Sequence, residues 1–276
     1  EQDLSLLAAR GVLEKLNGYM DRKDQAAFYP VAFESGVYQG QTYALPYESN
    51  PILMCVNKDL LDKEGIAVPK EGWTLEEFYT ICKKLTKDTN GDGQLDQFGS
   101  TEYTWKEALA ANGGHLFQGG MLKLTAPEVK ESLTFLQKLE DLNKNYKVSS
   151  KDFDQGKVAF YPMTLAQYRT YKPYPYHVSK YSNFTWTCIP MPAKSKTTKA
   201  TLVTTTSFAM SARSSHSKLA WELMQLLTED PEIQQTLFAQ SQGISVMPQV
   251  VKSRSSKDLL QVDDFGTDSL TNQTLK

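Results

Sequence analysis

Residues 74–99 read TLEEFYTICKKLTKDTNGDGQLDQFG, a stretch in which an amphipathic helix runs directly into a loop of regularly spaced oxygen-bearing side chains. Thr74 and Glu77 have the spacing of a capping box, so the sequence predicts a helix that begins after Thr74. Apolar side chains then recur at helical intervals, at Leu75, Phe78, Ile81, Cys82 and Leu85. One face of this helix is therefore expected to lie on a hydrophobic core.

The loop that follows has most of the spacing of an EF-hand calcium loop. Counted from the first aspartate, candidate ligands fall at positions 1, 3, 5, 7 and 9, namely Asp88, Asn90, Asp92, Gln94 through its backbone carbonyl, and Asp96. Gly93 permits the sharp turn at position 6, but Gly99 stands where the motif requires a bidentate Glu. Two interpretations stay open, a structural Ca²⁺ site or a polar turn whose side chains hydrogen-bond their own backbone.

The composition bounds the class of protein. The chain is 40% hydrophobic and 22% charged, with a net charge of -2, which predicts a soluble globular protein, and its 276 residues are long enough for two lobes. Basic residues are scattered, so nucleic acid and anionic membrane surfaces are excluded as principal partners, and direct membrane insertion is not expected. Three cysteines, Cys55, Cys82 and Cys188, lie in apolar settings and are predicted to be buried free thiols.

Strand and helix patterns alternate along the chain, which predicts an α/β fold. The apolar run from Pro51 to Val56 is expected to form a buried strand, followed by a short helix that stops at Gly65. Two longer helical patterns begin near Pro127 and Ser217. Their apolar positions are expected to face the core, among them Leu133, Leu136, Leu219, Leu223 and Trp221.

Several motifs in order resemble those of the family 1 extracellular solute-binding proteins of ABC transporters, which bind sugars and oligosaccharides. The matching stretches are YALPY, VNKDLLDKEGI, WTLEEFYTICKKLTKDTNGDGQLDQFG, QGKVA and SSHSKLAWELMQLLTEDPEIQ, between residues 3 and 250. The 74–99 stretch is the most specific of them. In place of the family's usual Gly-Gly pair before the last strand, this chain has Thr204, Thr205 and Thr206.

The resemblance implies a two-lobed periplasmic-binding-protein-like fold of type II, with a hinge between the lobes. Crossings are expected near Tyr47–Pro51 and near Trp186–Pro190. Lobe one would then comprise residues 1–49 and 190–250, lobe two residues 50–189, and residues 251–276 a polar crossing or tail. The chain is short for the family, so the N- and C-terminal parts of the family fold are expected to be missing and the chain to be a fragment.

The resemblance also suggests where a ligand would bind. A sugar presents apolar ring faces edged with hydroxyls, so its site needs aromatic platforms and planar polar side chains. By position in the family pattern, the candidates are Tyr47, Glu48 and Asn50 at the first crossing, Tyr103 and Trp105 before a helix, and Tyr168 and Arg169 after QGKVAFYP. The alternatives are a loop turn at the crossing, a core anchor at Trp105 and a surface salt bridge at Arg169. In a cleft, Arg169 would suit an acidic sugar.

The function implied is non-catalytic capture of a carbohydrate outside the cytoplasm and its presentation to the membrane permease of an ABC importer. The alternatives are a carbohydrate-active enzyme, or a surface adhesin or sensor accessory on the same fold. Ser215 and Lys218 fit S-x-x-K, but no S-D-N accompanies them. The excess of lysine over arginine favours a cell-surface lipoprotein of a Gram-positive bacterium over a periplasmic protein, with a lipid anchor upstream.

Overall fold

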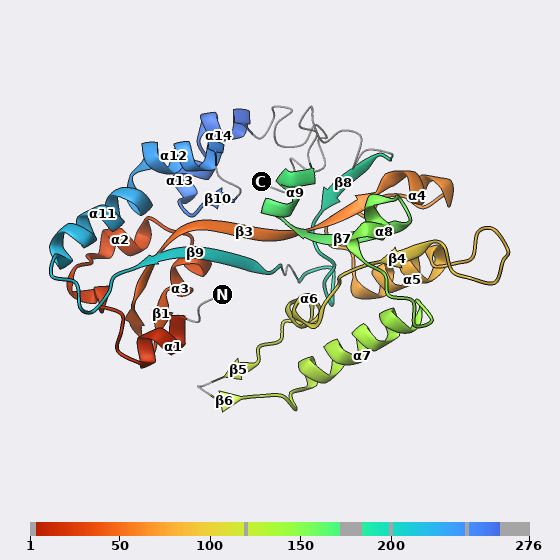
Figure 1. The fold of residues 1–276 in the computed structure, drawn as a ribbon, viewed down its shortest axis with the longest axis horizontal. Helices are drawn as coiled ribbons and strands as arrows, with labels where there is room; N and C mark the ends of the chain where they lie inside the picture. The colour runs from red at the N-terminus through yellow and green to blue at the C-terminus, as the bar shows by residue number, and fades with distance from the viewer. Residues whose placement is uncertain (1–3, 119–120, 172–183, 199–200, 241–242, 260–276) are drawn as a thin grey trace. The chain divides into compact units, whose positions relative to one another are not determined.

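The computed structural model describes residues 4–118, 121–171, 184–198, 201–240 and 243–259 (Figure 1). The chain divides into two compact units. Unit 1 combines the residues up to Asn50 with those from Val203 onward, and unit 2 is the continuous segment Pro51–Leu202. The α/β class and the likeness to two-lobed binding proteins are confirmed below by comparison with solved structures.

Unit 1 is built mainly of short helices around part of one long strand. Its elements are α1 (Leu4–Ala9), the 3₁₀ turn η1 (Leu16–Gly18), α2 (Arg22–Ala26), α3 (Pro30–Glu34), β1 (Val37–Tyr38), β2 (Gln41–Thr42), β9 (Val203–Ala209), α11 (Ser217–Glu229), α12 (Pro231–Gln240), β10 (Ile244–Ser245), α13 (Pro248–Val251) and α14 (Arg254–Leu259). The expected polar tail from residue 251 is helical as far as residue 259, and residues 260–276 lie outside the described part.

Unit 2 alternates strands with longer helices. Its elements are α4 (Lys58–Lys63), α5 (Leu75–Leu85), β4 (Phe98–Ser100), α6 (Trp105–Ala111), β5 (Phe117–Gln118), β6 (Met121–Leu122), α7 (Pro127–Asp141), α8 (Ser150–Asp154), β7 (Val158–Thr164), α9 (Leu165–Tyr171) and β8 (Trp186–Ile189). β4 and β7 are parallel, so their carboxyl ends point the same way.

Strand β3 (Ala44–Asn57) belongs to both units and is drawn in Figure 1 as one continuous ribbon. Its unit 1 part pairs with β10, and its unit 2 part pairs antiparallel with β7 and β8. The sequence predicted this strand only from Pro51. Pro46 and Pro51 lack a backbone N–H, which is why the run did not read as one strand.

The core of unit 2 is an aromatic cluster under α5. Phe78 of α5 lies with ring centroids 5.5 Å from both Trp73 and Phe160. The predicted capping box of α5 is confirmed, because Thr74 N–H donates to Glu77 Oε2 at 2.7 Å and Glu77 N–H to Thr74 Oγ1 at 3.2 Å. The helix was therefore correctly located by its cap and its apolar stripe.

Three leucine positions expected in the core are exposed instead. On α7, Leu133 is 53% exposed, and Ser132 takes the inward position, where its hydroxyl donates to the carbonyl of Glu128 at 2.6 Å and accepts from Asn112 Nδ2 at 3.1 Å. A hydroxyl can enter the core here because both bonds satisfy it. On α11, Leu219 and Leu223 are exposed, whereas Trp221 packs in the core of unit 1 as predicted.

The second boundary between the compact units lies at Leu202–Val203, later in the chain than the expected crossing near Trp186–Pro190. β8 pairs with the unit 2 part of β3, and residues 190–202 remain attached to unit 2. Lys194 N–H donates to the carbonyl of Ala111 at 2.9 Å, and Thr201 Oγ1 donates to that of Ile52 at 2.6 Å. These bonds keep the segment with unit 2 rather than with lobe one.

Candidate functional site

The three candidates on β3 differ in how their side chains are held. The ring of Tyr47 packs edge-on against Phe208 of β9, with centroids 4.9 Å apart. Asn50 Nδ2 donates to Glu48 Oε1 at 2.8 Å, which fixes the orientation of the Asn50 carboxamide. Gly243 makes room for Glu48, since a Cβ there would lie 2.3 Å from Glu48 Cγ.

The Asn50 carboxamide has one satisfied end and one unsatisfied end. Its Oδ1 is buried and has no hydrogen-bond partner within the described residues. A buried carbonyl oxygen without a donor costs about 1–3 kcal/mol, so such an atom calls for an explanation. A ligand hydroxyl or N–H that donates to Oδ1 would remove this cost.

Tyr103 and Trp105 lie together in a cavity of unit 2. The cavity has a volume of about 680 Å³, and its walls are residues 100–105, which follow β4, and residues of the C-terminal half of α7 and the loop after it. Trp105 is 41% exposed at the first position of α6, and Lys106 Nζ lies over its ring, 6.0 Å from the centroid. The cavity is large enough for a small ligand.

Two buried hydroxyls in this cavity lack partners within the described part of the chain. They belong to Thr101 and Tyr103, whose residues are only 3% and 6% exposed. Burial, followed by the nearby negative charge of Glu107, raises the pKa of Tyr103, which keeps the phenol protonated and able to donate. The sequence reading missed Thr101. Its signal is positional, because it directly follows the carboxyl end of a strand in a parallel pair, where α/β proteins place ligands.

The polar rim of the cavity is held by local hydrogen bonds. Glu102 adopts a left-handed backbone conformation with φ 51°, and its Oε1 accepts from Ser150 N–H at 3.0 Å. Thr104 caps α6 in a capping box with Glu107. Tyr146, which is half exposed, contacts Phe98 with its ring tilted by 35° and the centroids 5.2 Å apart, and it forms another wall.

Tyr168 and Arg169 fall on α9. Tyr168 is 2% exposed, and its ring meets that of Trp186 edge-on with centroids 5.4 Å apart. The side chain of Arg169 lies outside what the structure describes, as do residues 172–183. Tyr168 is thus packed among aromatic side chains of unit 2.

In the polar loop of residues 88–96, the carboxylate of Asp88 accepts hydrogen bonds from backbone N–H groups of the same loop. Asp88 Oδ1 accepts from the N–H groups of Asn90 and Gly91, at 3.1 and 2.7 Å, and Oδ2 accepts from Gly93 N–H at 2.7 Å. The Gly93 bond, followed by those from Gly91 and Asn90, lowers the pKa of Asp88. Gly91 and Gly93 have φ of 80° and 86°, which supply the turn.

The other candidate ligands of this loop also bond within it. Asp92 Oδ1 accepts from Gln94 N–H at 2.8 Å, and both oxygens of Asp96 accept from Thr89, at 2.9 and 2.8 Å. Among the described residues, no three His, Cys, Asp or Glu side chains are grouped so that they could hold a metal ion. This arrangement has the geometry of the Asx-rich turn, and the Ca²⁺ site remains a prediction.

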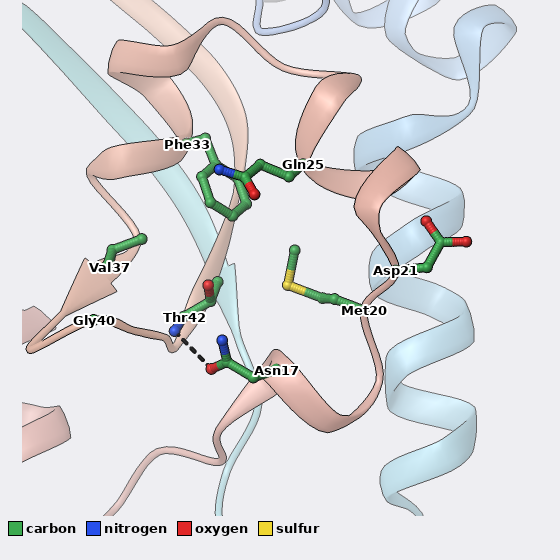
Figure 2. A pocket seen from close by; sticks show the side chains of 8 residues that line it. All are labelled: Asn17, Met20, Asp21, Gln25, Phe33, Val37, Gly40 and Thr42. Atoms are coloured by element: carbon green, nitrogen blue, oxygen red, sulfur yellow. Dashed lines mark hydrogen bonds between the residues drawn. The ribbon is translucent and has the colours of Figure 1, made fainter.

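A second cavity, of about 460 Å³, lies in unit 1 and contains none of the sequence candidates (Figure 2). The side chain of Met20 points into it, and Gln25 and Phe33 are among its lining residues (Figure 2). Asn17 Oδ1 accepts from Thr42 N–H at 2.9 Å, so its carbonyl is occupied. The polar groups here support local structure rather than converge on a point in the cavity.

One carboxyl group of unit 1 has a strongly altered environment. Burial, then the charges of Asp24 and Asp21, raise the pKa of Glu229 to about 7. Glu229 is the last residue of α11, at the negative end of the helix dipole, and its Oε1 is buried with no partner among the described residues. The carboxyl group of Glu229 is therefore harder to ionise than an ordinary glutamate, and it makes the stability of unit 1 depend on pH.

The family described as "Bacterial extracellular solute-binding protein" matches residues 1–262 of this chain. A protein of Brucella abortus named as a binding protein is 27% identical over 149 residues, which cover 50% of this chain and 36% of that protein. The chain thus spans about a third of the length of this curated relative. No helix in the described ranges is both long and apolar enough to cross a membrane.

Three solved structures are similar to this chain in fold. The Listeria monocytogenes ABC substrate-binding protein Lmo0181, in complex with cycloalternan, has a TM-score of 0.73 at 19% identity, with 93% of this chain and 66% of that chain covered. Mycobacterium tuberculosis UgpB, in complex with glycerophosphocholine, has a TM-score of 0.71 at 17% identity, with 93% of this chain and 65% of that chain covered. The third is the maltose/maltodextrin-binding domain MalE from Bdellovibrio bacteriovorus, bound to maltotriose. It has a TM-score of 0.66 at 21% identity, with 97% of this chain and 72% of that chain covered. At these identities the likeness establishes the fold alone.

Proposed function

This chain belongs to the family of bacterial extracellular solute-binding proteins, and we propose on that basis that it binds a carbohydrate outside the cytoplasm. The protein would deliver the sugar to the membrane permease of an ABC importer without breaking a bond in it. Two of the similar structures hold an oligosaccharide, cycloalternan in one and maltotriose in the other. The proposed ligand is therefore an oligosaccharide.

The observation that carries this proposal is the oriented, unsatisfied carboxamide of Asn50. Its Nδ2 donates a hydrogen bond to Glu48, and its buried Oδ1 has no hydrogen-bond donor among the described residues. A sugar hydroxyl both donates and accepts, so it can satisfy Oδ1 while using its own oxygen elsewhere. Asn50 is also the last residue of unit 1 on the strand that continues into unit 2.

The cavity of unit 2 is a second place where we propose contact with a sugar. The half-exposed ring of Trp105 offers a stacking face, and the hydroxyls of Thr101 and Tyr103 offer hydrogen bonds. Tyr168 would support unit 2 by packing. Arg169 would add affinity for an acidic sugar.

Isothermal titration calorimetry with a ligand panel tests the proposal. The panel comprises neutral malto- and manno-oligosaccharides, a uronic acid oligosaccharide and glycerophosphocholine, each followed afterwards by product analysis. Saturable binding of an oligosaccharide with the ligand recovered intact is expected. Binding of glycerophosphocholine alone would overturn the carbohydrate class, and cleavage of the bound sugar would overturn the non-catalytic role.

Single variants then locate the site. Asn50→Ala is expected to weaken binding by about 1–3 kcal/mol, or roughly 5- to 150-fold, because a hydrogen bond to a buried acceptor is lost. Gln41→Ala is the matched control, since it removes an amide of unit 1 that bonds the carbonyl of the neighbouring Gly40. Equal affinity of both variants and the unaltered protein would remove Asn50 from the site.

Trp105→Ala and Thr101→Val test the cavity of unit 2 separately. Loss of the stacking face should weaken binding by about 1–3 kcal/mol, with a smaller change in melting temperature than a core substitution causes, because Trp105 is 41% exposed. Thr101→Val keeps the shape and removes the hydroxyl. If neither variant alters affinity while Asn50→Ala does, the cavity takes no part in sugar binding.

The family description implies an extracytoplasmic location, and we propose in addition that the mature protein is a cell-surface lipoprotein of a Gram-positive bacterium. The excess of lysine over arginine supports this. Metabolic labelling of the full-length protein with a fatty acid tests the anchor. Absence of label from the surface-associated protein would rule the anchor out.

A further inference from the structure

Two of the three cysteines lie directly opposite one another on neighbouring antiparallel strands. Cys55 of β3 is the register partner of Cys188 of β8. Both residues are fully buried free thiols in the structure, as the sequence predicted, and their Sγ atoms are 2.8 Å apart. The third cysteine, Cys82 of α5, is also buried and contacts Gly99 of β4, where a Cβ would lie 2.4 Å from Cys82 Cα.

The strand register of the two residues is compatible with a disulfide. Residues paired across antiparallel strands have Cα atoms about 4.5–5.5 Å apart, within the range of roughly 4.4–6.8 Å found in disulfides. The two sulfur atoms are also closer than non-bonded sulfurs normally approach. A bond therefore needs only a small side-chain adjustment.

We propose that Cys55 and Cys188 form a disulfide that joins β3 to β8 within unit 2. The family is extracellular, and disulfides form and persist outside the cytoplasm. The bond would link positions 133 residues apart, so it would restrict a long stretch of the unfolded chain. The inference rests on the proposed function only through this location, and it is independent of what the protein binds.

The oxidant is an external disulfide, such as oxidised glutathione or a dithiol-disulfide oxidase. The thiolate of one cysteine attacks the external disulfide to give a mixed disulfide and releases one thiol of the oxidant. The second thiolate then attacks the mixed disulfide and releases the other thiol. Two protein thiols lose two electrons and two protons, and one external disulfide becomes two thiols. Because both side chains are buried in the folded unit, the exchange takes place during folding.

Thiol counting after oxidative folding tests the bond. The protein is unfolded in denaturant, refolded in a glutathione redox buffer, unfolded again and alkylated, and its intact mass is measured with and without prior reduction. We expect one alkyl group without reduction, on Cys82, and three after reduction. Three alkyl groups without reduction, or a peptide map that links Cys82 to either partner, would overturn the proposal.

Two variants separate the pair from the third thiol. Cys82→Ala should retain the bond and show no alkylation before reduction. Cys188→Ala should show two alkyl groups whether or not it is reduced. If Cys82→Ala fails to fold, the count on the unaltered protein still decides, because it needs no variant.

The melting temperature gives a second readout. Reduction of the oxidised protein should lower it by about 5–15 °C, the range expected for a disulfide that closes a long loop in a protein of this size. Cys188→Ala should melt at the same temperature with and without reductant. A reductant effect of equal size in both proteins would assign the shift to another cause and overturn the stabilising role.

Discussion

Replacing Glu229 with Gln should stabilise unit 1 at neutral and alkaline pH. The carboxyl is partly buried, accepts no hydrogen bond at Oε1 among the described residues and faces the charges of Asp24 and Asp21. Its position at the carboxyl end of α11 adds the unfavourable end of the helix dipole. Glutamine keeps the shape and removes the charge, so the repulsion and the desolvation cost of the ionised form both disappear.

The size and the pH range follow from the pKa of Glu229, about 7 in the folded protein against 4.5 for the ordinary group. At about 1.36 kcal/mol per unit, the difference corresponds to at most about 3.4 kcal/mol. Solvent screens this half-buried group, so about 1–2 kcal/mol is expected. Because the folded pKa is raised, Glu229 costs no stability below pH 4.5, and its destabilising contribution grows as the pH rises to about 7.

Urea denaturation of unaltered protein and Glu229→Gln at pH 8 and at pH 4.5 measures the effect. The variant should gain about 1–2 kcal/mol in free energy of unfolding at pH 8 and almost nothing at pH 4.5. Glu222→Gln removes a charge from an exposed position of the same helix and serves as the control. A gain of the same size at both pH values, or an equal gain in the control, would refute the reasoning.

Three further outcomes are expected. Thr74→Ala should lower the free energy of unfolding by about 1 kcal/mol by removing the cap of α5, whereas Thr74→Ser should keep it, as measured by urea denaturation. Gly36→Ala should cost about 1–3 kcal/mol or more, because the new Cβ would lie 2.1 Å from the carbonyl oxygen of Ala44, and an unchanged melting temperature would contradict the close approach. If the 88–96 loop holds Ca²⁺, a hundredfold excess over the dissociation constant, itself on the order of 10⁻⁴ to 10⁻³ M, should add about 2.7 kcal/mol. Asp88→Asn should abolish this gain, and a melting temperature indifferent to both millimolar calcium and EDTA would leave an Asx-rich turn.

Local features were predictable because their causes are local. The capping box of Thr74 and Glu77 and the apolar spacing after it located α5, and Pro127 at the first turn located α7. The same rules correctly placed Trp105 at the start of α6. Helix caps and periodicity act over a few residues, so one sequence contains all the information they need.

What failed depended on pairing between distant segments. Nothing near Cys55 indicates that Cys188 lies opposite, because the register between β3 and β8 is set by the packing of unit 2 as a whole. Leu219 was predicted to lie in the core because its spacing places it on the apolar face of the helix. Periodicity identifies such a face but does not show whether another element covers it. The unsatisfied hydroxyl of Thr101 was invisible for the same reason, because a missing partner can be recognised only when the surroundings are known.

The division of unit 1 between the two ends of the chain has a consequence for the order in which its parts can fold. The described part of unit 2 lies within the single segment Pro51–Leu202, whereas the residues up to Asn50 can complete their core only together with Val203 and the residues after it. Until then Phe33 and Leu45, both buried in the finished protein, have no core to enter. Apolar side chains of residues up to Asn50 therefore stay exposed until that later segment is present. A chaperone that recognises apolar segments would find its binding site in these residues.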